Sequence, residues 1–126
     1  MNRQSVFPTG RAAPLAPYSP GIRFGNLLFT AGAVGMDAKG KVPPDFREQT
    51  RNTMENLRAV LEAAGSGFDH VLKVTVFLTD MKDFAAMNEV YRSYFTGDLP
   101  ARSTIGVAAL ARPELTVEIE MVAHIP

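Results

Sequence analysis

Hydrophobic residues recur at helical spacing in the middle of the chain, where they predict a long amphipathic helix. Asp45 and Glu48 form a capping-box pattern at its start, and Gly65 lies just past its last apolar turn. Between them, steps of three and four residues give one stripe that we expect to be buried: Phe46, Thr50, Met54, Leu57, Leu61 and Ala64. The pattern predicts a helix of about five turns with one face in the core.

A second stripe at helical spacing predicts a shorter helix that starts at about Asp83. Its core side carries residues three and four apart: Phe84, Met87, Tyr91 and Phe95. Gly97 is expected to end this helix, because glycine readily adopts the left-handed conformation that often follows the last helical turn.

The N-terminal part of the chain is predicted to be a short strand, a long loop and a hairpin. Four prolines and a glycine between residues 7 and 20 favour an extended loop. Segments 22–24 and 27–29 flank Gly25-Asn26, a pair suited to a tight hairpin turn. Small residues dominate segment 30–35, where glycines allow the backbone to approach another group closely. We therefore regard segment 30–35 as a possible wall of a site.

Alternation of residue type predicts the remaining strands. A strand over residues 71–79 is rich in β-branched residues, and further strands are expected at about residues 103–110 and 115–125. On the last strand, one face carries the more polar set: Thr116, Glu118, Glu120, Val122 and His124. The order of elements indicates a single α+β domain over residues 1–126, with two helices on one face of a mixed sheet. The other face is then bare, which favours a homo-oligomer.

Composition narrows the class of protein. The 126 residues are 46% hydrophobic and 21% charged, as in one globular domain, and 13 basic residues balance 13 acidic ones. This balance makes nucleic acid and anionic membranes unlikely partners. There is no cysteine for a disulfide or a thiolate metal site, and no apolar run approaches the roughly 18 residues of a membrane span. We expect a cytoplasmic protein.

Arg102, Glu118 and Glu120 are the first candidates for binding or catalytic residues. Arg102 follows a rigid Pro-Ala pair at the start of a strand, where its planar fork could bind a carboxylate. Its alternative role is to cap the preceding helix or to pair with a surface acid. Glu118 and Glu120 share a strand face, either as solvated groups or as a catalytic pair. A carboxylate near Arg102 is expected to stay ionised and to orient or deprotonate water.

Tyr18 and Asn88 are weaker candidates. Tyr18 is held in the Pro-rich loop, where its ring either covers a small ligand or packs on the core. Asn88 lies on the second helix, where it reaches a neighbouring chain, helps to fix a backbone carbonyl or faces water. His70 and His124 are too isolated in the sequence to suggest a metal site. No phosphate-loop or dinucleotide motif is present, so we expect no metal and no organic cofactor.

Several ordered motifs resemble the RidA (YjgF) family of small trimeric proteins. They extend over roughly residues 17 to 124, and the strongest is the pairing of Pro-Ala-Arg-Ser with the later Val-Glu-Ile-Glu. In chain order they are Pro17-Tyr18-Ser19, Asn56-Leu57, residues 61–65, residues 74–78, residues 79–91, Pro100-Ala101-Arg102-Ser103 and Val117-Glu118-Ile119-Glu120.

The resemblance implies a chorismate-mutase-like α+β fold and a homotrimer, whose sheets form a central barrel with clefts between subunits. It also implies hydrolysis of reactive enamine or imine acids to a keto acid and ammonia, without a cofactor. In deaminating members the residue matching Arg102 grips the substrate carboxylate, and the one matching Glu118 handles the attacking water. Tyr18 and Asn88 then line the cleft.

The chain also departs from the family pattern. Members often have Ser-Gly-Gln where this chain has Ala31-Gly32-Ala33, and Cys where it has Thr104. Gly32 and the backbone of Thr104 could still donate N–H groups to a substrate. These departures leave open a pathway-specific deaminase of a ring-opened amino acid such as an aminomuconate, and a non-catalytic trimeric ligand-binding or chaperone-like protein. Ribonuclease activity is disfavoured by the neutral charge and by the lack of a catalytic histidine pair.

Overall fold

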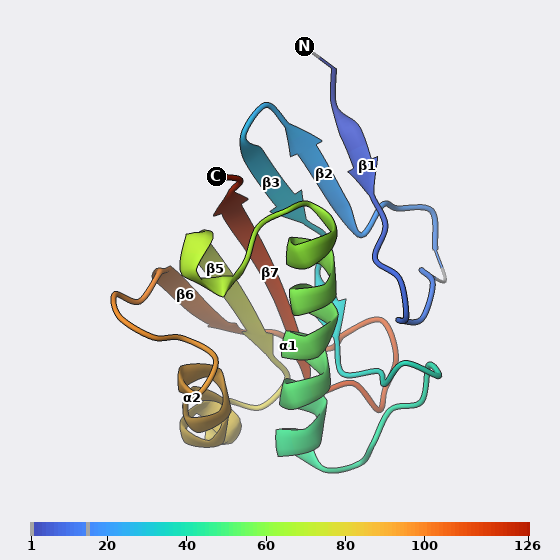
Figure 1. Cartoon of the computed structure of the whole chain (residues 1–126). Helices are drawn as coiled ribbons and strands as arrows, with labels where there is room; N and C mark the ends of the chain where they lie inside the picture. Colours follow the sequence, from blue (N-terminus) through green and yellow to red (C-terminus); the bar gives the residue numbers. More distant parts are fainter. Residues whose placement is uncertain (1, 15) are drawn as a thin grey trace.

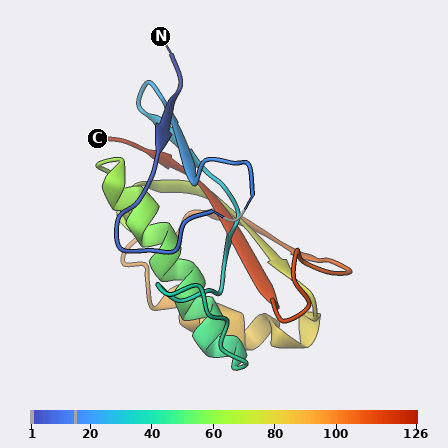
Figure 2. The same cartoon turned by 90° about the vertical axis from the view of Figure 1, so that its right-hand side faces the viewer.

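Two helices packed on one face of a mixed sheet make up the fold (Figures 1 and 2). The structure is a computed structural model that describes residues 2–14 and 16–126. The elements follow in the order β1 (Gln4–Val6), β2 (Gly21–Phe24), β3 (Leu27–Thr30), β4 (Ala33–Val34), α1 (Phe46–Ala63), η1 (Phe68–His70), β5 (Val71–Leu78), η2 (Met81–Asp83), α2 (Phe84–Arg92), β6 (Ala101–Gly106) and β7 (Val117–His124). The expected α+β arrangement is therefore confirmed.

The sheet has the strand order β1-β2-β3-β7-β5-β6, and β4 also pairs with β7. Only β5 and β6 run parallel, because η2 and α2 carry the chain across between them. Strands β3 and β4 both pair with the same edge of β7, β3 at residues 122–124 and β4 at residues 118–119. Residues 31–32 lie between these two pairings. This interruption of the sheet places residues 31–32 beside the middle of β7.

The boundaries of α1 are those that the sequence predicts. The Asp45 side chain accepts a 2.9 Å hydrogen bond from the Glu48 N–H at the first turn. After the last turn, Gly65 has a φ of 79°, a conformation in which a side chain would be strained. The helix buries its apolar stripe against the sheet, and Met54, Leu57 and Leu61 have no exposed surface. Each such side chain contributes about 1.5–3 kcal/mol of transfer free energy.

The sheet supplies the other half of this core. Its contribution comes from alternate residues on the two long central strands: Val74, Val76, Leu78, Val117, Ile119, Met121 and Ala123. Buried Gln49 of α1 joins the same region by donating to the carbonyls of Pro43 and Glu114 and accepting from Thr116. These bonds fix the segment that leads into β7.

Three predicted boundaries are wrong. Helix α2 ends at Arg92, and Gly97 has its φ of 72° in the loop that follows, so Gly97 does not cap the helix. Strand β6 is Ala101–Gly106 instead of residues 103–110, because it exists only where β5 offers partners, from Lys73 to Leu78. Strand β7 is Val117–His124 and so is shorter than residues 115–125, because its pairing with β5 and β3 extends only over residues 117–124.

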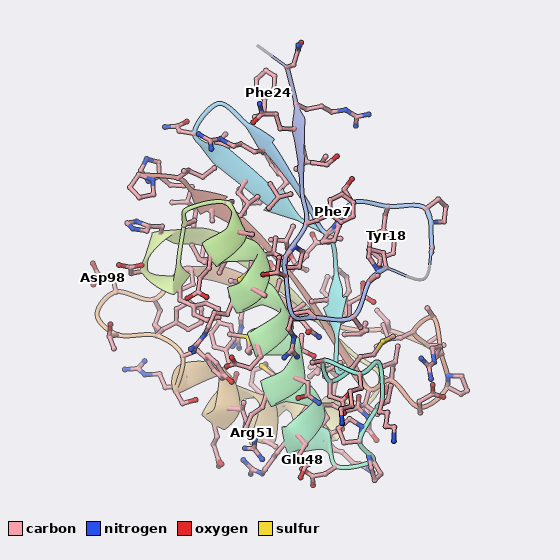
Figure 3. All side chains as sticks on the ribbon, turned by 45° about the vertical axis from the view of Figure 1, so that its right-hand side comes forward. Phe7, Tyr18, Phe24, Glu48, Arg51 and Asp98 are labelled. Carbon is pink, nitrogen blue, oxygen red and sulfur yellow. The ribbon has the colours of Figure 1, made fainter. Side chains whose placement is uncertain are left out.

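The face of the sheet turned away from the helices carries exposed apolar side chains. Leu28 is buried under the helices, so its neighbour Phe29 points to the opposite face, where it is 46% exposed. Ile105 of β6 pairs in register with Phe77 and is 44% exposed on that face. Phe24 at the end of the β2–β3 hairpin is also exposed (Figure 3).

None of the helices in the described part of the chain combines the length and the hydrophobicity of a membrane-spanning segment.

Candidate functional site

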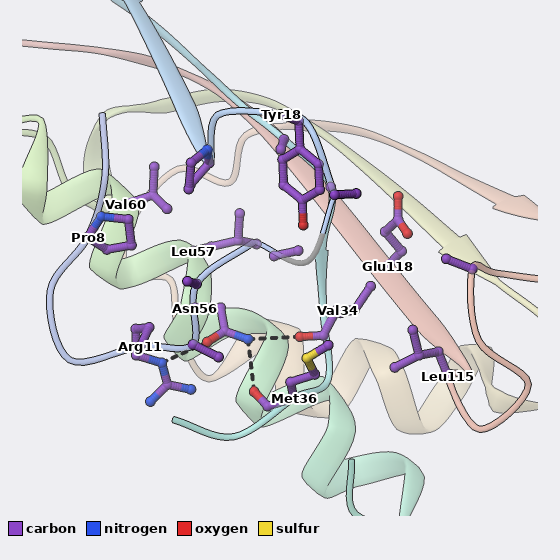
Figure 4. A pocket seen from close by; sticks show the side chains of 18 of the residues that line it. Pro8, Arg11, Tyr18, Val34, Met36, Asn56, Leu57, Val60, Leu115 and Glu118 are labelled. Carbon is purple, nitrogen blue, oxygen red and sulfur yellow. Dashed lines mark hydrogen bonds between the residues drawn. The ribbon is translucent and has the colours of Figure 1, made fainter. Parts of the chain in front are cut away.

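A cavity of about 440 Å³ lies where the Pro-rich loop crosses the interruption between β3 and β4. The loop contributes one wall, α1 contributes Asn56, Leu57 and Val60, and the start of β7 contributes Glu118 (Figure 4). The Ala31 N–H donates to the Pro20 carbonyl at 2.9 Å and ties the end of the loop to the sheet. The walls are mainly apolar, so the few polar groups decide what the cavity can bind.

Glu118 is the carboxylate that faces this cavity. It is paired in register with Val34 of β4 and Phe77 of β5. The backbone of Gly32 packs directly on its side chain, and a Cβ at position 32 would meet the carboxylate closer than 3.0 Å. The expected close backbone approach in segment 30–35 therefore occurs at Gly32, which only glycine permits.

The surroundings of Glu118 favour its protonated form. Burial raises the pKa of the Glu118 carboxyl above its ordinary value, and the charge of Glu120 on the same strand face raises that pKa further. We expected a carboxylate near Arg102 to stay ionised, but within one chain Arg102 does not act on Glu118. A carboxyl group whose pKa is raised toward neutrality is better suited to transfer protons in both directions.

Tyr18 forms the outer wall of the cavity. It comes from the Pro-rich loop and not from a helix or strand, and it is 51% exposed (Figure 3). Figure 4 shows its hydroxyl pointing into the space between Asn56 and Glu118. The small side chains of Ala31 and Ala33 line the cavity nearby. The alternative that Tyr18 packs on the core is wrong.

Arg102 lies in a second hollow of about 550 Å³ beside α2. Its Nη2 donates to Asn88 Oδ1 at 2.7 Å, and its Cζ lies 4.8 Å from the centre of the Tyr91 ring and 5.8 Å from that of Phe84. No acidic side chain among the described residues forms an ion pair with Arg102. The guanidinium is thus oriented by an amide and two aromatic rings, while its charge is not neutralised.

The predicted site residues fall into two groups within one chain. Tyr18, Ala31, Gly32 and Glu118 line the first cavity, whereas Asn88 and Arg102 line the second hollow. The side chains of Arg102 and Glu118 point to opposite faces of the sheet, because Arg102 is in register with Val74 on the helix side and Glu118 is in register with Phe77 on the other side.

Thr104 lines neither space. It is in register with Val76 on the helix side of β6.

Sequence reasoning missed two polar residues of the first cavity. Arg11 Nε donates to Asn56 Oδ1 at 2.7 Å, and the Asn56 amide donates to the carbonyls of Val34 and Met36 at 2.8 and 3.0 Å. Asn56 belongs to the Asn56-Leu57 motif of the family resemblance, and this motif was the only signal for it. Arg11 carried no signal, because nothing local determines where a Pro-rich loop crosses the fold.

His70 and His124 lie closer together than we expected. Their ring centres are 6.0 Å apart in an edge-to-face arrangement, because η1 leads into β5 next to the end of β7. Asp69 Oδ1 lies 3.7 Å from His70 Nε2. Neither histidine lines the two spaces described above. Within residues 2–14 and 16–126, no three His, Cys, Asp or Glu side chains are grouped as a metal site would require.

Known proteins resemble this chain over nearly its whole length. The family model described as endoribonuclease L-PSP matches residues 9–125. The RutC family protein PH0854 of Pyrococcus horikoshii is 44% identical over 124 residues, which are 97% of this chain and 98% of that protein. The RutC family protein PYRAB12510 of Pyrococcus abyssi is 40% identical over 126 residues, with 98% of both chains covered.

Solved structures agree with the fold. RidA from an Antarctic Psychrobacter matches with a TM-score of 0.93 and 34% identity, covering 97% of this chain and 99% of that one. Escherichia coli TdcF with bound serine matches with a TM-score of 0.91 and 34% identity, covering 96% and 98%. The chain therefore belongs to the endoribonuclease L-PSP family, which is the YjgF/RidA family, and it has the α+β fold of that family.

Proposed function

We propose that this protein hydrolyses the carbon–nitrogen double bond of imine acids and their enamine tautomers, giving a keto acid and ammonia. The observation that carries the proposal is Glu118, a partly buried carboxyl with a raised pKa that faces a mainly apolar cavity and packs on the backbone of Gly32. A carboxyl in such a place can take a proton from water and return it to a leaving amine.

The proposal requires a second chain. Arg102 and Glu118 lie in different hollows of one chain, so a substrate that contacts both must lie between subunits. The exposed Phe29 and Ile105 on the bare face supply the apolar surface for such an association. A homotrimer around a central barrel, as in the family resemblance, would bring the Arg102 hollow of one subunit to the Glu118 cavity of its neighbour.

A relative with a bound amino acid supports this substrate class. Escherichia coli TdcF, 34% identical to this chain, has a structure with bound serine. Serine carries a carboxylate and an amino group on one carbon. An imine acid carries a carboxylate next to its carbon–nitrogen double bond, so the two molecules present similar groups to a site.

In the proposed reaction, Arg102 binds the carboxylate through its planar fork, and Asn88 holds the guanidinium in position. Ionised Glu118 takes a proton from water as the water oxygen attacks the carbon of the protonated imine, which gives a neutral carbinolamine. Glu118 then gives that proton to the nitrogen, and ammonia leaves as the carbinolamine hydroxyl gives its own proton back to the Glu118 carboxylate, so that the keto acid forms. Tyr18 covers the site, and its hydroxyl can donate to the attacked substrate. Positioning and proton transfer each contribute orders of magnitude in rate.

The test is ammonia release from freshly generated imine acids, combined with subunit mixing. We expect each variant alone to lose most of its activity, about tenfold or more for Arg102→Lys and about a hundredfold or more for Glu118→Gln. If the site is shared between subunits, unfolding and refolding an equal mixture should restore intact sites, to roughly a quarter of the total under random assembly. Recovery of no activity would argue against a shared site. A wild-type protein that binds keto acids but releases no ammonia from any imine acid would favour a ligand-binding protein instead.

A further inference from the structure

The cavity that contains Glu118 is walled by apolar side chains that keep accessible surface. They come from the Pro-rich loop on one side and from the segment around β4 on the other. The cavity volume of about 440 Å³ is within the usual range of small-molecule sites, so a substrate with a side chain of several carbons has room. Six of these wall residues are half-buried: Pro8, Pro20, Ala31, Ala33, Val34 and Met36.

Val34 lies directly beside Glu118 in the sheet. Strands β4 and β7 are antiparallel, and Val34 is in register with Glu118, so the two side chains stand on the same face. Side chains paired in this way have Cβ atoms about 4.5–5.5 Å apart. Val34, Ala31 and Ala33 carry no side-chain group that can form a hydrogen bond. A substrate that reacts at Glu118 therefore meets an apolar surface beside its reacting end.

Two polar side chains of the wall, Asn56 and Arg11, are engaged with other protein groups. The Asn56 amide nitrogen donates to the Val34 carbonyl at 2.8 Å, and the Asn56 oxygen accepts from Arg11 Nε at 2.7 Å. Figure 4 shows the Arg11 guanidinium turned away from Tyr18 and Glu118. These two side chains therefore stabilise the wall and do not offer their polar groups to the reacting end of a substrate.

The second arginine of the wall, Arg112, is also engaged. It forms an ion pair with Glu114, so its charge is already balanced. By contrast, the Tyr18 hydroxyl and the Glu118 carboxyl form no hydrogen bond with another described residue, and both belong to the reacting end of the site. A polar side chain of a substrate would lose its hydrogen bonds to water in this cavity without regaining them from the engaged groups.

We infer that Ala31, Ala33, Val34 and Met36 form an apolar subsite for the side chain of the substrate, so that the protein selects imine acids with an extended or branched apolar side chain over short or charged ones. This inference rests on the proposed function and narrows its substrate class. The imine carbon lies at Glu118, and the substrate side chain packs on the apolar subsite. Each buried methylene should then raise affinity by up to about fourfold.

The first experiment measures how tightly keto acids, the stable products of the proposed reaction, bind to the wild-type protein in calorimetry. The series pyruvate, 2-oxobutanoate, 2-oxopentanoate and 2-oxohexanoate adds one methylene at a time and leaves the reacting end unchanged. We expect affinity to rise about twofold to fourfold per methylene, and about tenfold or more across the series. Equal affinities along the series, tightest binding of pyruvate, or no binding of any member would overturn the inference without any variant being made.

A pair of similar shape tests the charge of the side chain instead of its length. The two acids are 5-methyl-2-oxohexanoate, which ends in an isopropyl group, and 2-oxoglutarate, which ends in a carboxylate of nearly the same shape. We expect the apolar acid to bind roughly tenfold or more tightly, because the carboxylate would be desolvated without a partner. Equal or tighter binding of 2-oxoglutarate would contradict the apolar subsite and indicate a charged one.

Val34→Thr then tests whether the apolar subsite causes the preference. Threonine has nearly the shape of valine but places a hydroxyl beside Glu118, and the backbone carbonyl that Asn56 binds is kept. The gain from pyruvate to 2-oxohexanoate should shrink at least about threefold, while pyruvate binding changes less than about twofold. The matched control is Val107→Thr, at a half-buried valine that lines neither of the two spaces described above. An unchanged gain in Val34→Thr, or an equal loss in the control, contradicts the subsite.

Turnover separates this inference from the proposed function. The imines of the same acids are offered to the wild-type protein and to Val34→Thr, and ammonia release is followed. Catalytic efficiency that rises with apolar chain length in the wild type, and rises less in Val34→Thr, supports the subsite. If imines of all lengths are hydrolysed equally well, the subsite is wrong while the reaction stands. If no imine is hydrolysed but the preference in binding depends on Val34, the proposed reaction is wrong while the subsite stands.

Discussion

Replacing Glu118 by glutamine is the most direct perturbation of the proposed chemistry. Glutamine has nearly the same size, so it keeps the tight packing on Gly32 that any larger change would disturb. It can still hydrogen-bond a water molecule, but it cannot accept a proton at neutral pH. The change therefore removes proton transfer and leaves the shape of the cavity intact.

We expect kcat/KM for imine acids to fall at least about a hundredfold in Glu118→Gln. A hundredfold loss corresponds to about 2.7 kcal/mol of transition-state free energy. Binding of keto acids should change little, because Arg102 and its partner Asn88 lie in the other hollow of the chain and are untouched. Ammonia release and calorimetric binding of a keto acid score the two effects separately. Glu120→Gln is the matched control and should retain most of the activity.

The stability of the same variant gives an independent check. Burial and Glu120 raise the pKa of Glu118, so the folded state favours the protonated carboxyl more than the unfolded state does. The ionised form thus costs stability above the folded-state pKa, and this cost vanishes as pH falls below the unfolded-state value. Glu118→Gln should then melt at or above the wild-type temperature at pH 7, with a smaller difference at pH 4. Lower activity with a lower melting temperature at pH 7 would refute our interpretation, since the loss would reflect damage to the fold.

Further predictions concern the partners of this carboxyl. Glu120→Gln removes a negative charge that raises the pKa of Glu118, so the acid limb of kcat/KM should move to lower pH; an unmoved limb would assign it to another group. Arg102→Lys keeps the charge but loses the fork, and kcat/KM should fall about tenfold or more with an unchanged circular dichroism spectrum. Light scattering should give a mass near three chains. Phe29→Lys on the bare face should lower this mass. A stable wild-type monomer would contradict the shared site.

Local signals explain which parts of the fold could be predicted from the sequence. The start of α1 depends on Asp45 and Glu48, which are three residues apart, and its end depends on Gly65, so both were predictable. The ends of β6 depend on where β5 offers hydrogen-bonding partners. No residue within β6 indicates where this pairing begins or stops. Gly97 has the left-handed conformation that we expected, but it has it five positions after the helix has ended at Arg92.

The site shows the same division between local and long-range causes. Glu118 and Glu120 share a face because residues two apart on a strand always do, and this was predictable. Arg102 points to the opposite face because of the register of β6 against β5. The motifs shared with the family do not reveal this register. The place of Arg11 depends on a contact with Asn56, which lies 45 positions away in the sequence. Such pairs are visible only once the chain is folded.

The departures from the family pattern bear on the specificity of the proposed reaction. Where members often have serine and glutamine, Ala31 and Ala33 line the cavity here and offer no polar side-chain group to a substrate. Affinity for a small polar substrate must then be lower on that wall, since each missing hydrogen bond leaves a polar group of the ligand without a partner. On the proposed function, the mainly apolar wall of the cavity therefore decides specificity, while Glu118 and Arg102 act on the part that all imine acids share.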